Sequence, residues 1–427
     1  MIQNFFRFAF VALLFVWGSF QVNAAQIQRR PGDRKPSSKP TSSQVSDLVQ
    51  AAKEDAKAFR SMEPFSNEHM EKLKAFYDKY ASLHNESVSN NDALSSSRHC
   101  PVPIPPVTCN PKPGELDDGI SDKDRDVRRL RPQDIGAVLS FGDSITAGFA
   151  MSSGHIPFVQ ILEERGKVFS IGGDSGQLTL PNILRLYNPK LTGMSTDVTL
   201  PLATGNELNS AISGATSKIL NKEIDRAVSL LNGKYRAIKN QWKMITLLIG
   251  PNDVCGIISN TNPIEYGKNV RAAVERIRTD IGKAFVNLVG VLDVTQVHSA
   301  AQSDLYCAIY MNTFPIECPN AVPSKAPATR QRIAEYNAQL AQIADDYQAK
   351  NYSDFYVSVQ PAFEKAVFDK YGQGFLSGLD CFHPNVCANK AFAVGLWKNL
   401  FEPKGKKSTL YPENATIYCP KKGEYFQ

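Results

Sequence analysis

Short strand-like runs alternate with helical patterns through most of this 427-residue chain. The strand-like runs cover residues 137–141, 244–249, 285–292 and 355–359. Apolar residues recur at helical spacing in residues 217–231, 264–281, 329–350 and 388–401. Strands that alternate with helices predict an α/β fold, with a parallel sheet covered on both faces. Because ligands of such folds bind beyond the carboxyl ends of the strands, the loops that follow the strands are where chemistry is expected.

The N-terminal stretch has the pattern of a secretory signal peptide. Residues 5–20 are strongly apolar with Arg7 ahead of their core, and residues 22–24 precede a cleavage site near Ala24. An uncleaved membrane anchor is the alternative, but the apolar run of residues 5–20 is shorter than the roughly 20 residues that a bilayer span needs. No later run is long and apolar enough to span, and the polar tail after Cys419 is unlike a glycolipid-anchor signal. We therefore expect a secreted, extracellular protein.

Cysteine usage agrees with export. The cysteines lie at positions 100, 109, 255, 307, 318, 381, 387 and 419, and none forms the C-x-x-C pair of a zinc or redox site. An even count predicts disulfides, and Cys307 with Cys318 is the one pair that we predict. Sequons at Asn85, Asn351 and Asn414 predict glycans on a secreted chain.

Charge and missing motifs exclude several classes of protein. The formal net charge of +6 suits an anionic lipid surface and is far too small to indicate nucleic-acid binding. The sequence contains no G-x-S-x-G elbow, no His-Glu-x-x-His motif and no phosphate loop.

Changes in composition along the chain predict its domain organisation. Two amphipathic helices are expected between Val45 and about Leu83. For this segment a propeptide, a docking arm and a cap on the main domain all remain open. The predicted segments are a signal peptide (1–24), a basic disordered linker (25–44), a helical extension (45–84), a linker rich in Pro, Ser and Asn (85–129), the alternating α/β domain (130–403) and a C-terminal tail (404–427).

Residues able to carry chemistry gather in blocks that follow the predicted strands. The first block is Gly142-Asp143-Ser144, a turn between an apolar run and a predicted helix start. This order predicts that Ser144 lies at the carboxyl edge of the sheet, where the positive end of the helix dipole stabilises a nucleophile. The alternative is an ordinary turn in which Ser144 caps the helix. The later blocks are Asn209 to Thr216, Gly250-Pro251-Asn252-Asp253 and Asp380-Cys381-Phe382-His383.

A serine nucleophile needs a base that works near pH 7, and histidine is the natural choice. Of the six histidines, His383 has a carboxylate three residues before it. On a tight turn, Asp380 can hold the imidazole tautomer while Nε2 points at Ser144. A surface ion pair is the alternative for this pair, and His155 and His298 remain open by position.

Donors for a developing oxyanion can also be assigned. We expect them to be the backbone N–H groups of Ser144 and Gly214 and the side-chain amide of Asn252. Alternatively, Gly214 is only a turn glycine and Asn252 caps the next helix. Supporting roles, mostly in bracing these loops, fall to Gly142, Asp143, Asn209, Gly250 and Asp253.

A second Gly-Asp-Ser sequence and a pair of adjacent glutamates are further candidates for site residues. A second Gly-Asp-Ser occurs at residues 173–175, but glycine on both sides and a nearby proline suit an irregular loop, so Ser144 is preferred to Ser175. The pair Glu163-Glu164 is predicted to be a solvated helix face rather than an acid/base pair.

The blocks resemble, in this order, the signatures of SGNH hydrolases of the GDSL esterase and lipase class. The resemblance covers roughly residues 130–403 and implies a three-layer α/β/α, flavodoxin-like fold with a mostly parallel, five-stranded sheet. It also implies a Ser144–His383–Asp380 mechanism with an acyl-enzyme intermediate, and no metal or cofactor.

Longer stretches are similar to one branch of that class, the animal phospholipase B proteins. These stretches are residues 169–174, 179–189, 242–255, 284–289 and 396–403. That resemblance implies release of fatty acids from phospholipids and lysophospholipids, with peripheral binding to a micelle or membrane surface. Departures are Ile145 and Pro251, where the family commonly has Leu and Gly. A deacetylase of short-chain or carbohydrate esters and a catalytically idle lipid-binding or interaction protein remain the alternatives.

Overall fold

The computed structural model describes residues 42–57, 67–80, 83, 100–152, 162–200, 203, 205–256, 258–313, 317–365, 368–411 and 414–427. The predicted signal peptide, nearly all of the basic linker and Asn85 lie outside this set. The chain divides into two compact units, residues 1–47 and 48–427, which we treat separately. Of the first unit, the structure describes only the start of helix α2 (Ser42–Lys57).

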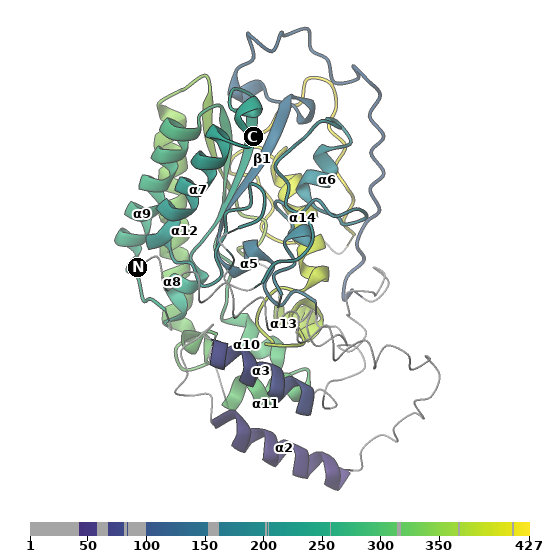
Figure 1. Cartoon of the computed structure of the whole chain (residues 1–427), viewed down its shortest axis with the longest axis vertical. Helices are drawn as coiled ribbons and strands as arrows, with labels where there is room; N and C mark the ends of the chain where they lie inside the picture. Colours follow the sequence, from purple (N-terminus) through teal and green to yellow (C-terminus); the bar gives the residue numbers. More distant parts are fainter. Residues whose placement is uncertain are drawn as a thin grey trace, which may run out of the picture. The chain divides into compact units, whose positions relative to one another are not determined.

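The second unit is built on a parallel sheet, as predicted (Figure 1). Neighbouring strands are hydrogen-bonded in the order β1-β2-β3-β4. The first three strands are buried along their whole length, which explains why most of their residues are apolar. The strands are β1 (Ile135–Gly142), β2 (Trp242–Leu248), β3 (Ala284–Val289) and β4 (Phe355–Gln360).

The described residues form four strands rather than the five that we expected. Isolated bridges occupy the free edge of β1, where Thr192 pairs with Ala137 and Asn209 pairs with Ser140. The backbone N–H of Val138 donates to Thr192 O (3.0 Å), and Ser210 N donates to Ser140 O (3.0 Å). Two separate segments therefore share the edge that one continuous strand would fill.

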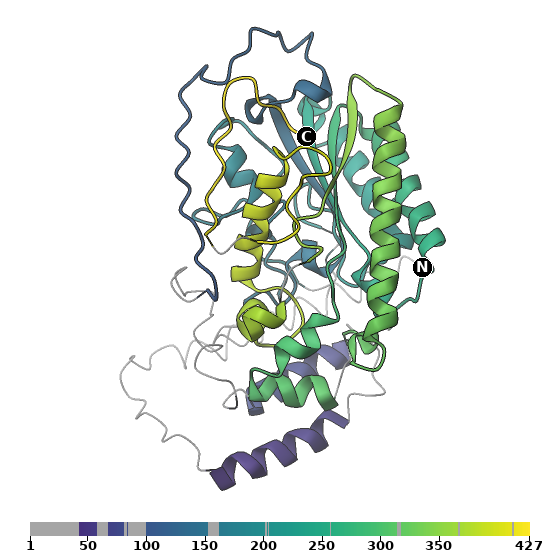
Figure 2. The ribbon, with the colours of Figure 1, turned by 180° about the vertical axis from the view of Figure 1, so that it is seen from behind.

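Helices cover both faces of the sheet (Figures 1 and 2). On one face lie α7 (Leu220–Asn232), α9 (Pro263–Arg276) and α12 (Ala326–Ala349). On the other lie α6 (Leu180–Leu184) and α14 (Val386–Asn399). The three-layer α/β/α prediction is therefore confirmed for the described residues.

Helix α9 illustrates how local sequence sets these elements. The side chain of Asn262 caps it by accepting from Glu265 N (2.9 Å), and Pro263 occupies its first position. Its buried face packs on α12, where the rings of Tyr266 and Tyr336 stack at 4.0 Å. The helical pattern continues past Arg276 through one π-helical turn, Ile277–Ile281.

Further helices complete the described part of this unit. They are α3 (Asn67–Tyr80), α5 (Ser144–Ala147), α8 (Pro251–Cys255), α10 (Gln296–Ala301), α11 (Leu305–Thr313) and α13 (Phe368–Tyr371). Single 3-10 turns cover Val127–Arg129, Pro132–Asp134, Arg165–Lys167, Ser217–Ile219, Arg236–Ile238, Pro319–Ala321 and Gly372–Phe375. In the part of the chain that the structure describes, no helix combines the length and the apolarity needed to cross a membrane.

The predicted disulfide between Cys307 and Cys318 is wrong. Cys318 instead bonds to Cys255, because α8 packs against the turn after Cys318 and brings the two Cα atoms within 4.4 Å. Cys307 bonds to Cys381. The remaining pairs are Cys100–Cys387 and Cys109–Cys419. Four disulfides are typical of a protein that folds in an oxidising, extracellular or secretory compartment.

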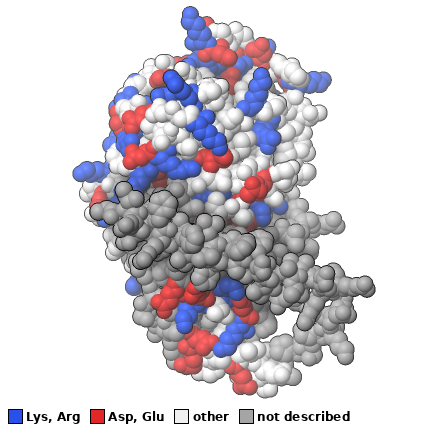
Figure 3. Space-filling view, in the orientation of Figure 1, with Lys and Arg blue, Asp and Glu red and all other residues white. Residues whose placement is uncertain are grey.

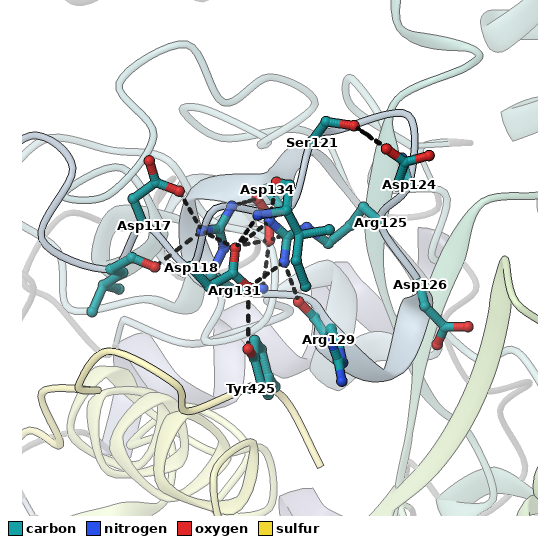
Figure 4. A network of polar contacts seen from close by, with 12 residues as sticks. Asp117, Asp118, Ser121, Asp124, Arg125, Asp126, Arg129, Arg131, Asp134 and Tyr425 are labelled. Carbon is teal, nitrogen blue, oxygen red and sulfur yellow. Dashed lines mark hydrogen bonds and ion pairs between the residues drawn. The ribbon is translucent and has the colours of Figure 1, made fainter.

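Residues 100–134 form a strap that is fastened to the C-terminal part of the chain. Besides the disulfides of Cys100 and Cys109, a polar network holds it (Figure 4). Asp118 accepts hydrogen bonds from Arg125 (2.6 Å) and Arg131 (3.0 Å), and Tyr425 donates to the same carboxylate (3.1 Å). The segments predicted as a linker and a tail thus contact each other, while the exact domain boundaries stay a prediction.

Part of the predicted helical extension also packs on this unit. Leu73, Phe76 and Tyr80 of α3 are buried, and the Phe76 ring lies 5.6 Å from that of Tyr306 and 6.0 Å from that of Tyr310 on α11. These contacts bury one face of α3 against α11. Figure 3 shows Lys and Arg interspersed with Asp and Glu on the visible described surface.

Candidate active site

The turn after β1 presents Ser144. Gly142 has φ +151°, and a Cβ there would lie 2.2 Å from the carbonyl oxygen of Leu248, so only glycine fits. Asp143 caps α5, because its Oδ1 accepts from Ile145 N at 3.0 Å. The helix cap is thus Asp143 rather than Ser144, which leaves the Ser144 hydroxyl for another partner.

That partner is His383. Its Nε2 lies 2.7 Å from Ser144 Oγ, and its Nδ1 lies 2.6 Å from Asp380 Oδ2. Asp380 Oδ1 also accepts from the backbone N–H groups of Phe382 and His383, at 3.0 Å each. All three predicted side chains are buried, with exposed fractions of 3% for Ser144, 2% for His383 and 0% for Asp380. A carboxylate thus holds one ring nitrogen while the other faces the hydroxyl, which is the arrangement that activates a serine.

The surroundings make His383 a stronger base than a free imidazole. Burial by itself lowers its pKa, but the charge of Asp380 and the hydrogen bond to it outweigh burial, so the pKa of His383 lies above its ordinary value of 6.5. The negative charges of Glu317 and Asp143 act in the same direction. The protonated, imidazolium form of His383 is therefore favoured relative to a free imidazole.

The loops that carry the expected oxyanion donors contact one another. Gly214 has φ +80° on a tight turn. The Asn252 side chain, 7% exposed, donates from Nδ2 to Ala215 O at 3.0 Å, which leaves its second amide proton for another acceptor. The Ile212 N–H donates to Gly142 O at 3.1 Å. Backbone next to Gly214 is thus tied both to the strand end before Ser144 and to Asn252.

The supporting residues mostly brace backbone. Asn209 is fully buried; its Nδ2 donates to Thr146 O (2.9 Å) and its Oδ1 accepts from Ala211 N (3.1 Å). Asp253 accepts from both the N–H and the hydroxyl of Ser217. Gly250 is the residue immediately before α8. Burial raises the pKa of the Asp143 carboxyl to about 7.

The alternative residues lie elsewhere. Ser175 is exposed on a turn, and the carboxylate of Asp174 beside it accepts from Asp197 N. His298 lies on α10, where burial lowers its pKa, and His155 falls outside the described residues.

The prediction for Glu163-Glu164 is wrong, since both side chains are 0% exposed. Glu163 pairs with Arg165, and Glu164 accepts from Ser152 and pairs with Lys167. Two adjacent glutamates look like a solvated surface in sequence, and only the arginine and lysine just beyond them hint that both charges are paired.

Sequence reasoning also missed two buried carboxylates. Glu223 of α7 accepts from Gly142 N at 2.8 Å and so holds the strand end before Ser144. Glu317 is 4% exposed, and burial raises its pKa, as does the charge of Asp380. No local signal marks either residue, because each acts across a long sequence separation.

Comparisons with known proteins agree with this geometry. A family model described as GDSL-like Lipase/Acylhydrolase matches residues 138–396, more than half of the chain. The chain is 31% identical over 322 residues to a membrane-associated phospholipase B1 of Rattus norvegicus, which covers 69% of this chain and 22% of that protein. For the Homo sapiens protein of the same name the values are 30% over 321 residues, 70% and 22%. The chain thus spans about a fifth of the length of these curated relatives.

Among solved structures, the chain is similar to a GDSL-like lipase from Parabacteroides merdae. The TM-score is 0.33 and the identity 15%, with 62% of this chain and 96% of that chain covered. The family match and the curated relatives together support esterase or lipase chemistry. The chain belongs to the GDSL-like lipase and acylhydrolase family.

Proposed function

We propose that this protein is a secreted serine esterase that hydrolyses the fatty-acyl esters of phospholipids and lysophospholipids, without a metal or cofactor. The observation that carries the proposal is the chain of short contacts from Ser144 through His383 to Asp380 in a member of an acylhydrolase family. Secretion is supported by four disulfides and by the apolar N-terminal pattern. The exposed side chains of Asn351 and Asn414 are candidates for glycans.

The reaction proceeds in two halves. Ser144 Oγ attacks the acyl carbonyl carbon while His383 Nε2 takes its proton, and Asp380 stabilises the imidazolium that forms. The N–H groups of Ser144 and Gly214 and the amide of Asn252 stabilise the tetrahedral oxyanion. Collapse breaks the ester bond, His383 returns the proton to the leaving alcohol, and the acyl group stays on Ser144. Water activated by His383 then releases the fatty acid.

The substrate class rests on the relatives. Two of them are named phospholipase B1, at 30–31% identity across about 70% of this chain. Long acyl chains are presented at a micelle or membrane surface, and we propose that the protein binds such a surface peripherally.

The test is release of fatty acid and glycerophosphocholine from phosphatidylcholine micelles by the secreted protein. Ser144→Ala should abolish release, whereas Ser175→Ala, on the exposed turn, should match the wild type. A short-chain acetyl ester and a fluorophosphonate label complete the assay. Cleavage of the acetyl ester alone would make the protein a short-chain deacetylase. Absence of both cleavage and labelling would leave a lipid-binding protein without catalysis.

A further inference from the structure

The loop that carries Gly214 has little regular structure of its own. Residues 209–216 contain neither helix nor extended strand, so contacts from outside must fix the direction of the Gly214 N–H. On one side of Gly214, Ala215 O accepts from Asn252. On the other side, the contacts come from a buried ion pair in the segment that precedes the loop by nearly fifty residues.

That ion pair joins Glu163 and Arg165, both 0% exposed. Arg165 Nη2 lies 2.7 Å from Glu163 Oε2, and Arg165 Nε donates to the same oxygen at 3.1 Å. The backbone of Glu163 is itself fixed, since it exchanges two 2.9 Å hydrogen bonds with Thr199. The carboxylate therefore has a defined position.

Atoms of this pair reach the loop at two points. The Ser213 hydroxyl donates to Glu163 Oε1 at 2.6 Å, and Arg165 Nη2 donates to Ala211 O at 3.0 Å. Ser213 is the residue immediately before Gly214, and it is 4% exposed. Burying an ion pair gains little net stability compared with apolar packing, so a role in fixing geometry explains its presence better than a role in stability.

We propose that Glu163 and Arg165 are positioning residues for the oxyanion site, acting through Ser213 and Ala211 on the Gly214 N–H. The inference rests on the proposed function, because it assigns Gly214 a part in stabilising the transition state. A donor displaced by a fraction of an ångström loses much of that stabilisation while substrate binding is unaffected. The effect therefore falls on kcat rather than on KM.

The test removes one hydroxyl. Ser213→Ala should lower kcat for a soluble short-chain p-nitrophenyl ester about 10- to 100-fold, with KM changed by less than about twofold. The inhibition constant of a trifluoromethyl ketone, whose adduct with Ser144 carries an oxyanion, should rise in parallel. Ser213→Thr keeps the hydroxyl and should restore kcat. Ser213→Cys keeps nearly the same volume with a weaker donor, so it should show the same direction of change even if the alanine variant does not fold.

The matched control is Ser152→Ala. Ser152 is buried like Ser213 and donates a 2.6 Å hydrogen bond to the neighbouring carboxylate, Glu164, and its side-chain hydrogen bonds among the described residues go to Glu164 and Lys167 rather than to the loop. Its loss should lower the melting temperature about as much and leave kcat unchanged. Equal kcat losses in both variants, or unchanged kcat in Ser213→Ala and Ser213→Cys, would overturn the inference. Activity in Ser144→Ala would instead overturn the proposed function itself.

Discussion

The hydroxyl of Tyr306 donates a 2.8 Å hydrogen bond to the carbonyl oxygen of Leu379, the residue immediately before Asp380. The next residue on α11, Cys307, is bonded to Cys381, the residue immediately after Asp380. Helix α11 thus holds the turn on both sides of the carboxylate that contacts His383. The position of that carboxylate therefore depends on a helix about seventy residues earlier in the chain.

Tyr306→Phe tests the polar half of this attachment. The change leaves the buried Leu379 carbonyl without this partner, which should lower the free energy of unfolding by about 1–3 kcal/mol and reduce kcat as the turn loosens. Urea unfolding and ester hydrolysis measure the two effects. Tyr411→Phe is the control, because Tyr411 donates a similar 2.9 Å bond to Pro103 O at an exposed site. Equal effects in both variants would contradict a special role for Tyr306.

Asn252→Ala tests the side-chain donor proposed for the oxyanion. Loss of one such donor should lower kcat about 10²- to 10³-fold with a smaller change in KM. The control is Asn320→Ala, which removes an amide that donates to Val254 O of the same short helix at 2.9 Å. The control should lose stability and retain kcat. An active Asn252→Ala protein would mean that the amide only supports the loop through Ala215.

The pH dependence follows from the surroundings of His383. The base must be neutral to accept a proton, so kcat/KM should fall as pH drops through the pKa of His383, with a midpoint above 6.5. Glu317→Gln removes a nearby negative charge that favours the imidazolium, so the pKa should decrease and activity should extend to lower pH. Because the charges of Glu317 and His383 act on each other, the displacement of the whole acidic limb is the quantity to measure.

Glu275→Gln provides the control for that profile. Glu275 of α9 pairs with Arg278 and with Tyr347 of α12, and its charge is not one of the main influences on the pKa of His383. Its acidic limb should match the wild type. If the acidic limb of the Glu317→Gln profile moved to higher pH, or did not move, the predicted effect of the Glu317 charge on His383 would be wrong.

The ion pairs of Asp118 in the strap should make the free energy of unfolding depend on pH. The hydrogen bond from Arg125 holds the pKa of Asp118 well below its usual 3.8, so the folded state favours the ionised carboxylate. That contribution is present above the unfolded pKa of about 3.9 and is lost as pH falls below it. Asp118→Asn should therefore lower the free energy of unfolding by about 3 kcal/mol at pH 7, and the difference should narrow below about pH 4.

Asp117→Asn, at the adjacent position, is the control for this measurement. The Asp117 side chain is 67% exposed and contacts Arg131 at 3.4 Å, so its loss should cost less than about 1 kcal/mol. If the two variants lost equal stability, or if the Asp118→Asn difference persisted at low pH, the network would not act through its charge.

Much of the architecture follows from local pattern. The positions of all four strands and of the long helices were predictable, because a buried parallel strand and an amphipathic helix each impose a period on a short stretch of chain. The pairing of Asp380 with His383 was equally predictable, since residues three apart on a tight turn face the same way. Neighbouring sequence alone specifies these features.

Contacts between distant segments were not predictable in the same way. Cys318 bonds to Cys255 rather than Cys307 because α8 packs against the turn that follows Cys318. The Glu163 side chain is buried because Arg165, Thr199 and Ser213 surround it. A sequence window around Glu163 contains only one of these three partners.

The sequence by itself therefore determined the α/β layers, the family and the residues that meet in the candidate active site, because each depends on local periodicity or on short motifs in a fixed order. The tertiary structure alone decided the disulfide pairing, the two separate segments that bridge to the edge of β1 in the described chain, and the buried charges behind the Gly214 loop. Those features depend on the path of long irregular segments, and the free energy of such contacts is set by neighbours that chain folding brings together.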